Sequence, residues 1–219
     1  MDILELIRNC VVTGHATRKD IISPENKETL GVKELIQQAL DEKVDINKIL
    51  NEGLIQGINH VGEKFSAGEF FVPDMLMSAQ AMKAGMKVLE PFLATGIIKR
   101  TGKVILGTVK GDMHDIGKNL VGLMLEGNGF EIIDLGIDTP IEKFVEAGES
   151  NPDAIIGMSA LLTTTMENMR ATIHALRNNR LTNKVIVGGA PITQHFADEI
   201  GADGYSKDAA GAVNMVKNL

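Results

Sequence analysis

The sequence has little cysteine and few aromatic residues. It holds one cysteine, one tyrosine and no tryptophan among 219 residues. A single thiol excludes a framework of disulfides within the chain. Basic residues are also few, since 22 lysines and arginines stand against 29 aspartates and glutamates, a net charge of −7. This acidic balance argues against nucleic acids or anionic membrane surfaces as partners.

Long apolar runs are missing as well. No stretch is long enough to span a bilayer, and the first eight residues carry acids where a signal peptide would carry basic residues. The hydrophobic content of 44% is that of an ordinary globular protein. We therefore expect a cytoplasmic protein with no membrane association, whose partners are proteins or small molecules.

Apolar residues at helical spacing fill the first 90 positions. They predict four helices, over residues 2–12, 24–40, 45–65 and 73–91. Ser23 followed by proline is typical of a helix start, as is Asp45, and residues 66–68 break the third helix. Four helices with short connections indicate an antiparallel four-helix bundle, which we assign to residues 1–94.

The second half of the chain alternates strands and helices. Short β-branched runs predict strands near residues 103–109, 131–135, 153–158, 184–188 and 203–205. Helices are expected near residues 116–127, 140–149, 164–179, 193–200 and 208–218. This alternation is typical of an α/β fold with a doubly wound, Rossmann-like parallel sheet, for which we expect the strand order 2-1-3-4-5. Residues 103–219 form this domain, and residues 95–102, with two glycines and two basic residues, are the expected linker.

A charged loop follows the first predicted strand. In Gly111-Asp-Met-His-Asp-Ile-Gly117, His114 lies between Asp112 and Asp115. Ligands bind at the carboxyl ends of the strands in an open parallel sheet, so the loop presents this histidine rather than burying it. A carboxylate that accepts the proton of one imidazole nitrogen makes the other nitrogen a better metal ligand. The glycines at both ends of the loop permit close approach of a bulky group.

The loop alone leaves plainer interpretations open. An Asp-x-His triplet is common by chance, and Asp112 or Asp115 could simply cap the next helix beside a solvated His114. A phosphate-binding flavodoxin-like domain or a receiver domain also stays open on these residues. No second histidine or cysteine lies nearby in the sequence. A metal bound by His114 would therefore need its remaining ligands from a cofactor.

The loop resembles the Asp-x-His-x-x-Gly signature of corrinoid (vitamin B12) binding proteins, in which the histidine is the lower ligand of cobalt. Two later segments strengthen the resemblance. Ser159-Ala-Leu161 is similar to the family's Ser-x-Leu, and Gly188-Gly189 is similar to its glycine pair. With the helical half, the resemblance covers nearly the whole chain. It extends to the corrinoid proteins of methylamine and methanol methyltransferase systems and to the cobalamin module of methionine synthase.

The resemblance implies a cobalamin or related corrinoid as cofactor. His114 would be the axial ligand of cobalt, and Asp112 and Ser159 would form a proton relay to it. The other residues that the resemblance places at the cofactor in this half are Gly111, Met113, Asp115, Ile116, Gly117, Leu161, Thr163, Gly188, Gly189, Tyr205 and Ala209.

In the helical half, three segments resemble the cap that shields the upper face of the corrin: residues 51–57, 61–65 and 71–75. Phe65, Val72 and Met75 fall on apolar cap positions, and Glu52 falls on the acidic one. On periodicity alone, the apolar residues of the bundle are its core.

Glycines end several predicted strands: Gly107, Gly136, Gly157 and Gly188-Gly189. Such glycines could leave a slot beside the first and fourth strands for the nucleotide tail of the cofactor. Glycine is also routine where a strand turns into a helix, so both interpretations stay open.

The function that the resemblance implies is a corrinoid-dependent methyl carrier. It would accept a methyl group on cobalt from a substrate:corrinoid methyltransferase and pass it to a second methyltransferase with tetrahydrofolate or a thiol as acceptor. The chain would be non-catalytic alone and would also need a reductive activase. Two alternatives are a B12-dependent sensor or regulatory domain and a mutase small subunit. A sensor would want a basic DNA-binding region, and a mutase subunit needs no shielding bundle.

Overall fold

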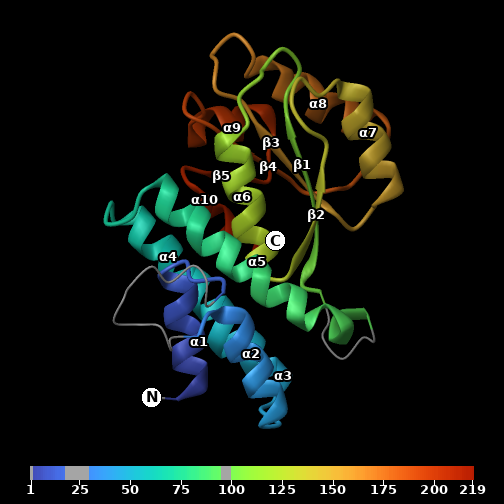
Figure 1. Ribbon diagram of the computed structural model, residues 1–219. Coiled ribbons are helices and arrows are strands. Elements are labelled where there is room, and N and C mark those ends of the chain that lie inside the picture. Colours follow the sequence, from blue (N-terminus) through green and yellow to red (C-terminus); the bar gives the residue numbers. More distant parts are fainter. Residues whose placement is uncertain (1, 18–29, 95–99) are drawn as a thin grey trace. The chain divides into compact units, whose positions relative to one another are not determined.

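The computed structural model describes residues 2–17, 30–94 and 100–219 (Figure 1). The chain divides into two compact units, residues 1–100 with 126–129, and residues 101–125 with 130–219. The first unit is helical and the second is built on a parallel sheet. Most of the expected linker, residues 95–99, lies outside the described residues. Within the described ranges, no helix has both the length and the apolar character needed to cross a bilayer.

The helical unit confirms the predicted helices. Its elements are α1 (Ile3–Val12), α2 (Val32–Asp41), α3 (Ile46–Lys48), the π-helical segment η2 (Ile49–Ile55), α4 (Gln56–Ser66) and α5 (Val72–Ala94). α1 packs against α2, α4, α5 and η2. Glycine lets these helices approach closely, because a Cβ at Gly57 would lie 2.8 Å from Val11 and one at Gly85 would lie 2.8 Å from Leu54.

Two helix ends differ from the prediction. α5 was expected to stop near Pro91 but continues to Ala94. Pro91 therefore lies inside the last turn of α5 rather than at its end. α2 begins at Val32, because Gly31 is extended and the Glu34 carboxylate accepts its N–H at 3.1 Å. The predicted start at Ser23 lies outside the described residues.

The third predicted helix contains an unexpected π-helical stretch. Its start is as predicted, since Asp45 Oδ1 accepts the N–H groups of Asn47 and Lys48 at 2.7 and 3.2 Å. The chain then widens into η2, a geometry that hydrophobic spacing does not distinguish from an α-helix. Arg8 Nε donates to the Glu52 carbonyl of this stretch at 3.0 Å. Gly68, at φ +75°, follows the helix and confirms the predicted break.

The second unit contains the predicted five-stranded parallel sheet. Its strands are β1 (Gly102–Thr108), β2 (Phe130–Asp134), β3 (Ile155–Ser159), β4 (Val185–Gly188) and β5 (Gly204–Ser206). Their order is β2-β1-β3-β4-β5, which confirms the expected topology. The helices are α6 (Ile116–Gly127), α7 (Ile141–Ser150), α8 (Glu167–Asn178), α9 (Gln194–Ile200) and α10 (Ala209–Lys217).

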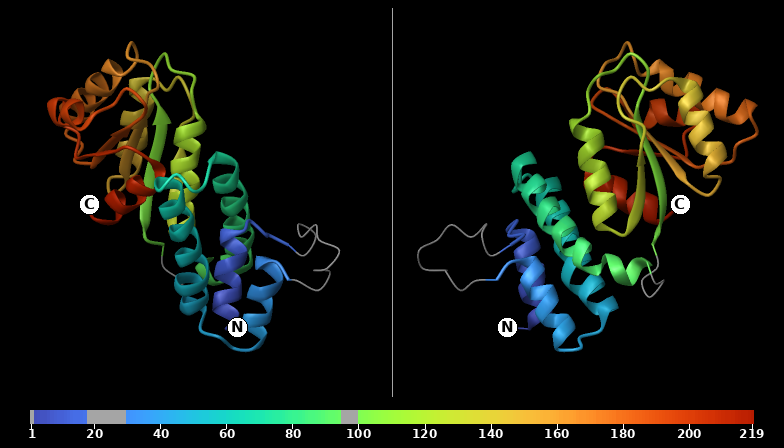
Figure 2. Two further views of the ribbon diagram at one scale, coloured as in Figure 1. Left: turned by 90° about the vertical axis from the view of Figure 1, so that its left-hand side faces the viewer. Right: turned by 45° about the vertical axis from the view of Figure 1, so that its right-hand side comes forward.

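Helices cover both faces of this sheet (Figure 2). Right-handed crossovers that run toward opposite edges must lie on opposite faces, so α6 and α7 take different sides. The face under α7, α8 and α9 holds the main core of the unit, which includes Phe144, Ile156, Met169, Leu176 and Phe196. Thr108, Ser159 and Gly188 are register partners across the sheet. The carboxyl ends of β1, β3 and β4 are therefore level.

The strand glycines do not all leave the expected slot. A Cβ at Gly107 would lie 2.6 Å from the ring of Phe144, and a Cβ at Gly157 would lie 2.6 Å from the side chain of Leu106. The space beside these two glycines is filled by the protein's own core, so they serve packing of the unit. Gly136, at φ +89°, does have open space beside it.

Candidate functional site

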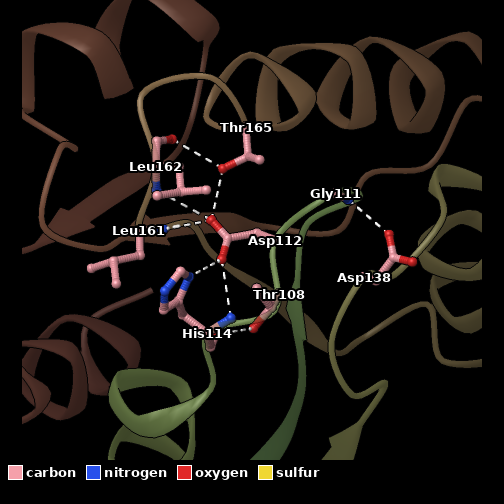
Figure 3. Close-up of polar contacts among 8 residues, drawn as sticks. All are labelled: Thr108, Gly111, Asp112, His114, Asp138, Leu161, Leu162 and Thr165. Atoms are coloured by element: carbon pink, nitrogen blue, oxygen red, sulfur yellow. Dashed lines mark hydrogen bonds and ion pairs between the residues drawn. The ribbon is translucent and has the colours of Figure 1, made fainter.

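The candidate site is the loop between β1 and α6 (Figure 3). The strand is extended by Val109, whose N–H donates to the Ser159 carbonyl at 3.0 Å. The chain then turns, because the Asp112 N–H donates to the Val109 carbonyl at 3.1 Å and Gly111 adopts φ +82°. This turn buries Asp112 completely and leaves the His114 side chain half exposed.

Asp112 holds both the ring and the backbone of His114. Its Oδ1 accepts from His114 Nδ1 at 2.7 Å and from the His114 N–H at 3.1 Å. The Thr108 hydroxyl also donates to the His114 carbonyl, at 2.9 Å. A carboxylate at Nδ1 fixes the proton there and leaves the lone pair on Nε2. The predicted pairing of Asp112 with His114 is confirmed, and the pair leaves one ring nitrogen to bind a ligand.

The second oxygen of Asp112 is held by the loop after β3. Oδ2 accepts from the Thr165 hydroxyl at 2.7 Å, the Leu161 N–H at 2.8 Å and the Leu162 N–H at 3.2 Å. Among the described residues, the Ser159 hydroxyl does not hydrogen-bond to this carboxylate, and its expected place in the relay stays a prediction. Ser159 is the last residue of β3, whereas the turn that follows brings Thr165 over Asp112. Thr165 therefore supplies the side-chain hydroxyl that contacts Asp112.

The surroundings of Asp112 keep it ionised. Burial alone would raise the pKa of its carboxyl, but the hydrogen bonds from Thr165, Leu161 and His114 together outweigh burial and hold this pKa well below its usual range. Asp112 is thus a carboxylate throughout the physiological pH range. Its negative charge favours electron donation through the far nitrogen of the His114 ring.

Replacing Thr165 by valine should loosen this arrangement without changing the size of the side chain much. Asp112 would lose one donor to a buried, charged oxygen, so we expect the free energy of unfolding to fall by about 2 kcal/mol. The pKa of Asp112 should rise, because a hydrogen bond to its charged form is gone. Denaturant unfolding and carbon-13 chemical shifts of the carboxyl measure the two effects. Thr164→Val, at the exposed neighbouring position, is the control and should change neither.

Apolar side chains next to His114 are exposed to solvent. Met113 and Ile116, on the same loop, are 63% and 69% exposed, and Leu161 and Leu162 are each more than 40% exposed. A side chain at Gly117 would meet nothing within 4 Å, so the loop offers room as well. A flat and largely apolar ligand that takes its metal to Nε2 of His114 would cover these side chains.

The other sequence-predicted residues of the sheet unit lie along the same edge. Gly189 adopts φ +130°, and a Cβ there would lie 1.8 Å from the Ala160 carbonyl oxygen, so the glycine is required for β4 to meet the β3 loop. Thr163 is exposed in that loop. Tyr205, in the edge strand β5, and Ala209, at the start of α10, lie farther along the sheet from β1.

Asp115 and the expected cap residues contribute differently. Asp115 accepts from the Asn119 side chain at 2.9 Å, a contact within α6 and its first turn. Glu52, Phe65, Val72 and Met75 lie in the helical unit, with Met75 buried and the other three partly exposed. Their role above a corrin stays a prediction.

An ion pair between a buried lysine and a half-exposed aspartate joins the helix after the loop to the sheet, a contact that sequence reasoning missed. Lys118 of α6 is buried, and its Nζ lies 2.7 Å from Asp134 Oδ1 at the end of β2. Burial would raise the pKa of Asp134, but Lys118 and the Gly136 N–H lower it below its usual value. The pair ties α6 to the edge strand one turn after His114.

Comparisons with known proteins agree with this site. Residues 102–214 and residues 28–90 each match a B12 binding domain. The chain is 41% identical over 224 residues to a corrinoid protein of Desulfitobacterium hafniense, a match that covers 100% of this chain and 98% of that protein. The chain belongs to the corrinoid proteins. The chain is also 43% identical over 192 residues to dimethylamine corrinoid protein 3 of Methanosarcina acetivorans, a match that covers 85% of the chain and 90% of that relative.

A solved structure is similar over nearly the whole chain. The methanol:cobalamin methyltransferase complex MtaBC from Methanosarcina barkeri matches with a TM-score of 0.80 and 28% identity, covering 99% of this corrinoid protein and 78% of the matched chain. The cofactor of the family is a corrinoid. The residues of the site fit a corrinoid. Nε2 of His114 can act as a metal ligand because Asp112 bonds to Nδ1, and the exposed side chains of Met113 and Ile116 offer apolar surface beside the ring.

Proposed function

We propose that this corrinoid protein carries a methyl group from a substrate-specific methyltransferase to a second methyltransferase, whose acceptor is tetrahydrofolate or a thiol. The single observation that carries the proposal is the Asp112–His114 pair, at 2.7 Å, with the far ring nitrogen directed away from its carboxylate partner (Figure 3). The bound corrinoid supplies the chemistry, because its cobalt both accepts and releases methyl groups. The chain supplies a ligand whose proton and orientation are fixed.

The relay explains how one histidine can serve two transfers. Asp112 bonds to the His114 ring through Oδ1, while its Oδ2 accepts from the Thr165 hydroxyl and the Leu161 N–H. A proton taken up by the ring therefore meets a carboxylate that other donors already hold. Such a network can hold a proton near the ring or give it up as the demand for an axial ligand changes. The backbone carbonyl of Ser159 accepts from the Val109 N–H at the start of the same turn, and its hydroxyl stays a candidate member of the relay.

The relatives support the choice of partners. One relative is named for dimethylamine and a similar structure is a methanol:cobalamin methyltransferase complex. We infer that this chain likewise takes its methyl group from a separate protein specific for a small methylated compound. A second methyltransferase and a reductive activase complete the proposed set of partners.

Methyl transfer with and without partner proteins tests the proposal. The reduced holo-protein should gain almost no methyl group from methylamines, methanol or betaine until a matching methyltransferase is added. Visible absorbance follows the cofactor, and the apo-protein with the same methyltransferase is the control. Adding the second methyltransferase and its acceptor should then remove the methyl group. Rapid methylation of the purified chain by one free donor would show that it is an enzyme in its own right and would contradict the carrier role.

A further inference from the structure

Asp138, in the connection between β2 and α7, contacts the His114 loop twice. Its Oδ1 accepts the Gly111 N–H at 2.7 Å (Figure 3). Its own N–H donates to the Asp112 carbonyl at 2.9 Å. One residue thus holds the backbone on both sides of the peptide that joins Gly111 to Asp112. Lys110 Nζ lies 3.1 Å from the same carboxylate, but both side chains are well exposed, so this ion pair is weak.

The conformation of Asp138 is unusual and suits these two contacts. Its φ of +46° lies in the left-handed region, where aspartate is among the few residues other than glycine found regularly. The next residue, Thr139, forms a parallel bridge with Val109, so the connection is joined to the end of β1. On the other side of the loop, Asn168 of α8 donates to the Lys110 carbonyl at 2.7 Å. The turn before Asp112 is therefore held from two directions.

We propose that Asp138 is a positioning residue that sets how firmly His114 is presented to the corrinoid. The proposal rests on the proposed role of His114 as the ligand of cobalt. Gly111 is exposed, so water can replace the carboxylate at its N–H, and loss of the Asp138 side chain should cost little folding stability. Without the Asp138 side chain, however, the loop would gain conformational freedom. Corrinoid binding would have to remove that freedom, so the affinity would fall.

Three variants separate the side chain from the backbone. Asp138→Gly keeps the left-handed backbone and the N–H to Asp112 but removes the acceptor for Gly111. Asp138→Asn keeps an acceptor oxygen and tolerates the same backbone conformation. Arg180→Gly is the matched control, because Arg180 also has a positive φ, of 60°, at the end of α8. The Arg180→Gly variant shows how a glycine at a position of positive φ changes the stability of the protein.

The probe is a corrinoid that lacks the nucleotide tail, so that the protein must supply the nitrogen ligand. Absorbance titration of the apo-variants should show binding weakened about fivefold by Asp138→Gly, the effect of one ordinary hydrogen bond. Asp138→Asn and Arg180→Gly should stay within about twofold of the unmodified protein, since neither removes that bond. Thermal unfolding of Asp138→Gly should match that of Arg180→Gly.

A second readout needs no cofactor. Nitrogen-15 chemical shifts of the His114 ring report which ring nitrogen carries the proton. A change in the free energy of unfolding would not by itself alter these shifts. We expect Asp138→Gly to populate both tautomers and Asp138→Asn to keep the Nδ1 proton. Unchanged binding and ring shifts in Asp138→Gly would overturn the inference, as would an equal defect in Asp138→Asn. If His114→Ala binds the tail-less corrinoid as tightly as the unmodified protein, then His114 is not the ligand of cobalt. That result would contradict the proposed function rather than the role of Asp138 alone.

Discussion

His114→Ala should remove the nitrogen that the protein offers to cobalt. In the unmodified protein the ring is fixed by Asp112 at Nδ1, and half of the side chain is open to a ligand. Loss of a residue that merely orients a metal ligand typically weakens binding 10- to 100-fold, so loss of the ligand itself should weaken the tail-less corrinoid by at least roughly 100-fold. Electron paramagnetic resonance of the cobalt(II) form should lose the splitting from imidazole nitrogen.

The control for this variant is His174→Ala, at an exposed position on α8. It should leave both the affinity and the nitrogen splitting unchanged. A nitrogen signal from protein imidazole that survives in His114→Ala would mean that another histidine is the ligand, and the site described above would then have to be reassigned.

Asp112→Asn should destabilise the sheet unit strongly. Both oxygens of the carboxylate face only donors, Oδ1 toward His114 and Oδ2 toward Leu161 and Thr165. An amide group placed in either orientation would point its own N–H at another donor. Because the residue is fully buried, we expect the free energy of unfolding to fall by about 3 to 4 kcal/mol at pH 7.

The pH dependence of this loss has a definite sign. The pKa of Asp112 is depressed in the folded protein, so its stabilising effect is complete above the ordinary aspartate pKa of about 4 and is lost as the pH falls below it. The difference in unfolding free energy between the unmodified protein and Asp112→Asn should therefore become smaller as the pH is lowered below about 4. Asp115→Asn is the matched control, since the described contacts of the Asp115 side chain are limited to the side chain of Asn119 in the following helix. A difference that stays constant down to low pH would contradict the proposed ionised state.

The sequence predicted the fold well because periodicity and turn residues determine it. Alternating strand and helix patterns, together with right-handed crossovers, leave few arrangements other than the observed 2-1-3-4-5 order. The misses are local. The π-helical stretch η2 shares the apolar spacing of an α-helix, and α5 continues to Ala94 although the predicted helix ended near Pro91.

The site was predictable only in part. Asp112 and His114 are two residues apart, so their contact follows from a short motif, and Gly189 was found because a glycine pair is conspicuous. Thr165 was missed in favour of Ser159, because a hydroxyl's direction depends on how the β3 loop turns, which spacing does not reveal. Asp138 was missed because its contacts are made by backbone groups of a loop distant in sequence.

The buried carboxylate also bears on the biosynthesis of the protein. The donors that orient Asp112 from the β3 loop follow it by 49, 50 and 53 residues. A nascent chain that has emerged only as far as β2 therefore contains His114 without the groups that fix its partner Asp112. Such distant contacts form late, since intervening segments must first be ordered. The Asp112–His114 pair should accordingly reach its final geometry only after the third strand has joined the sheet.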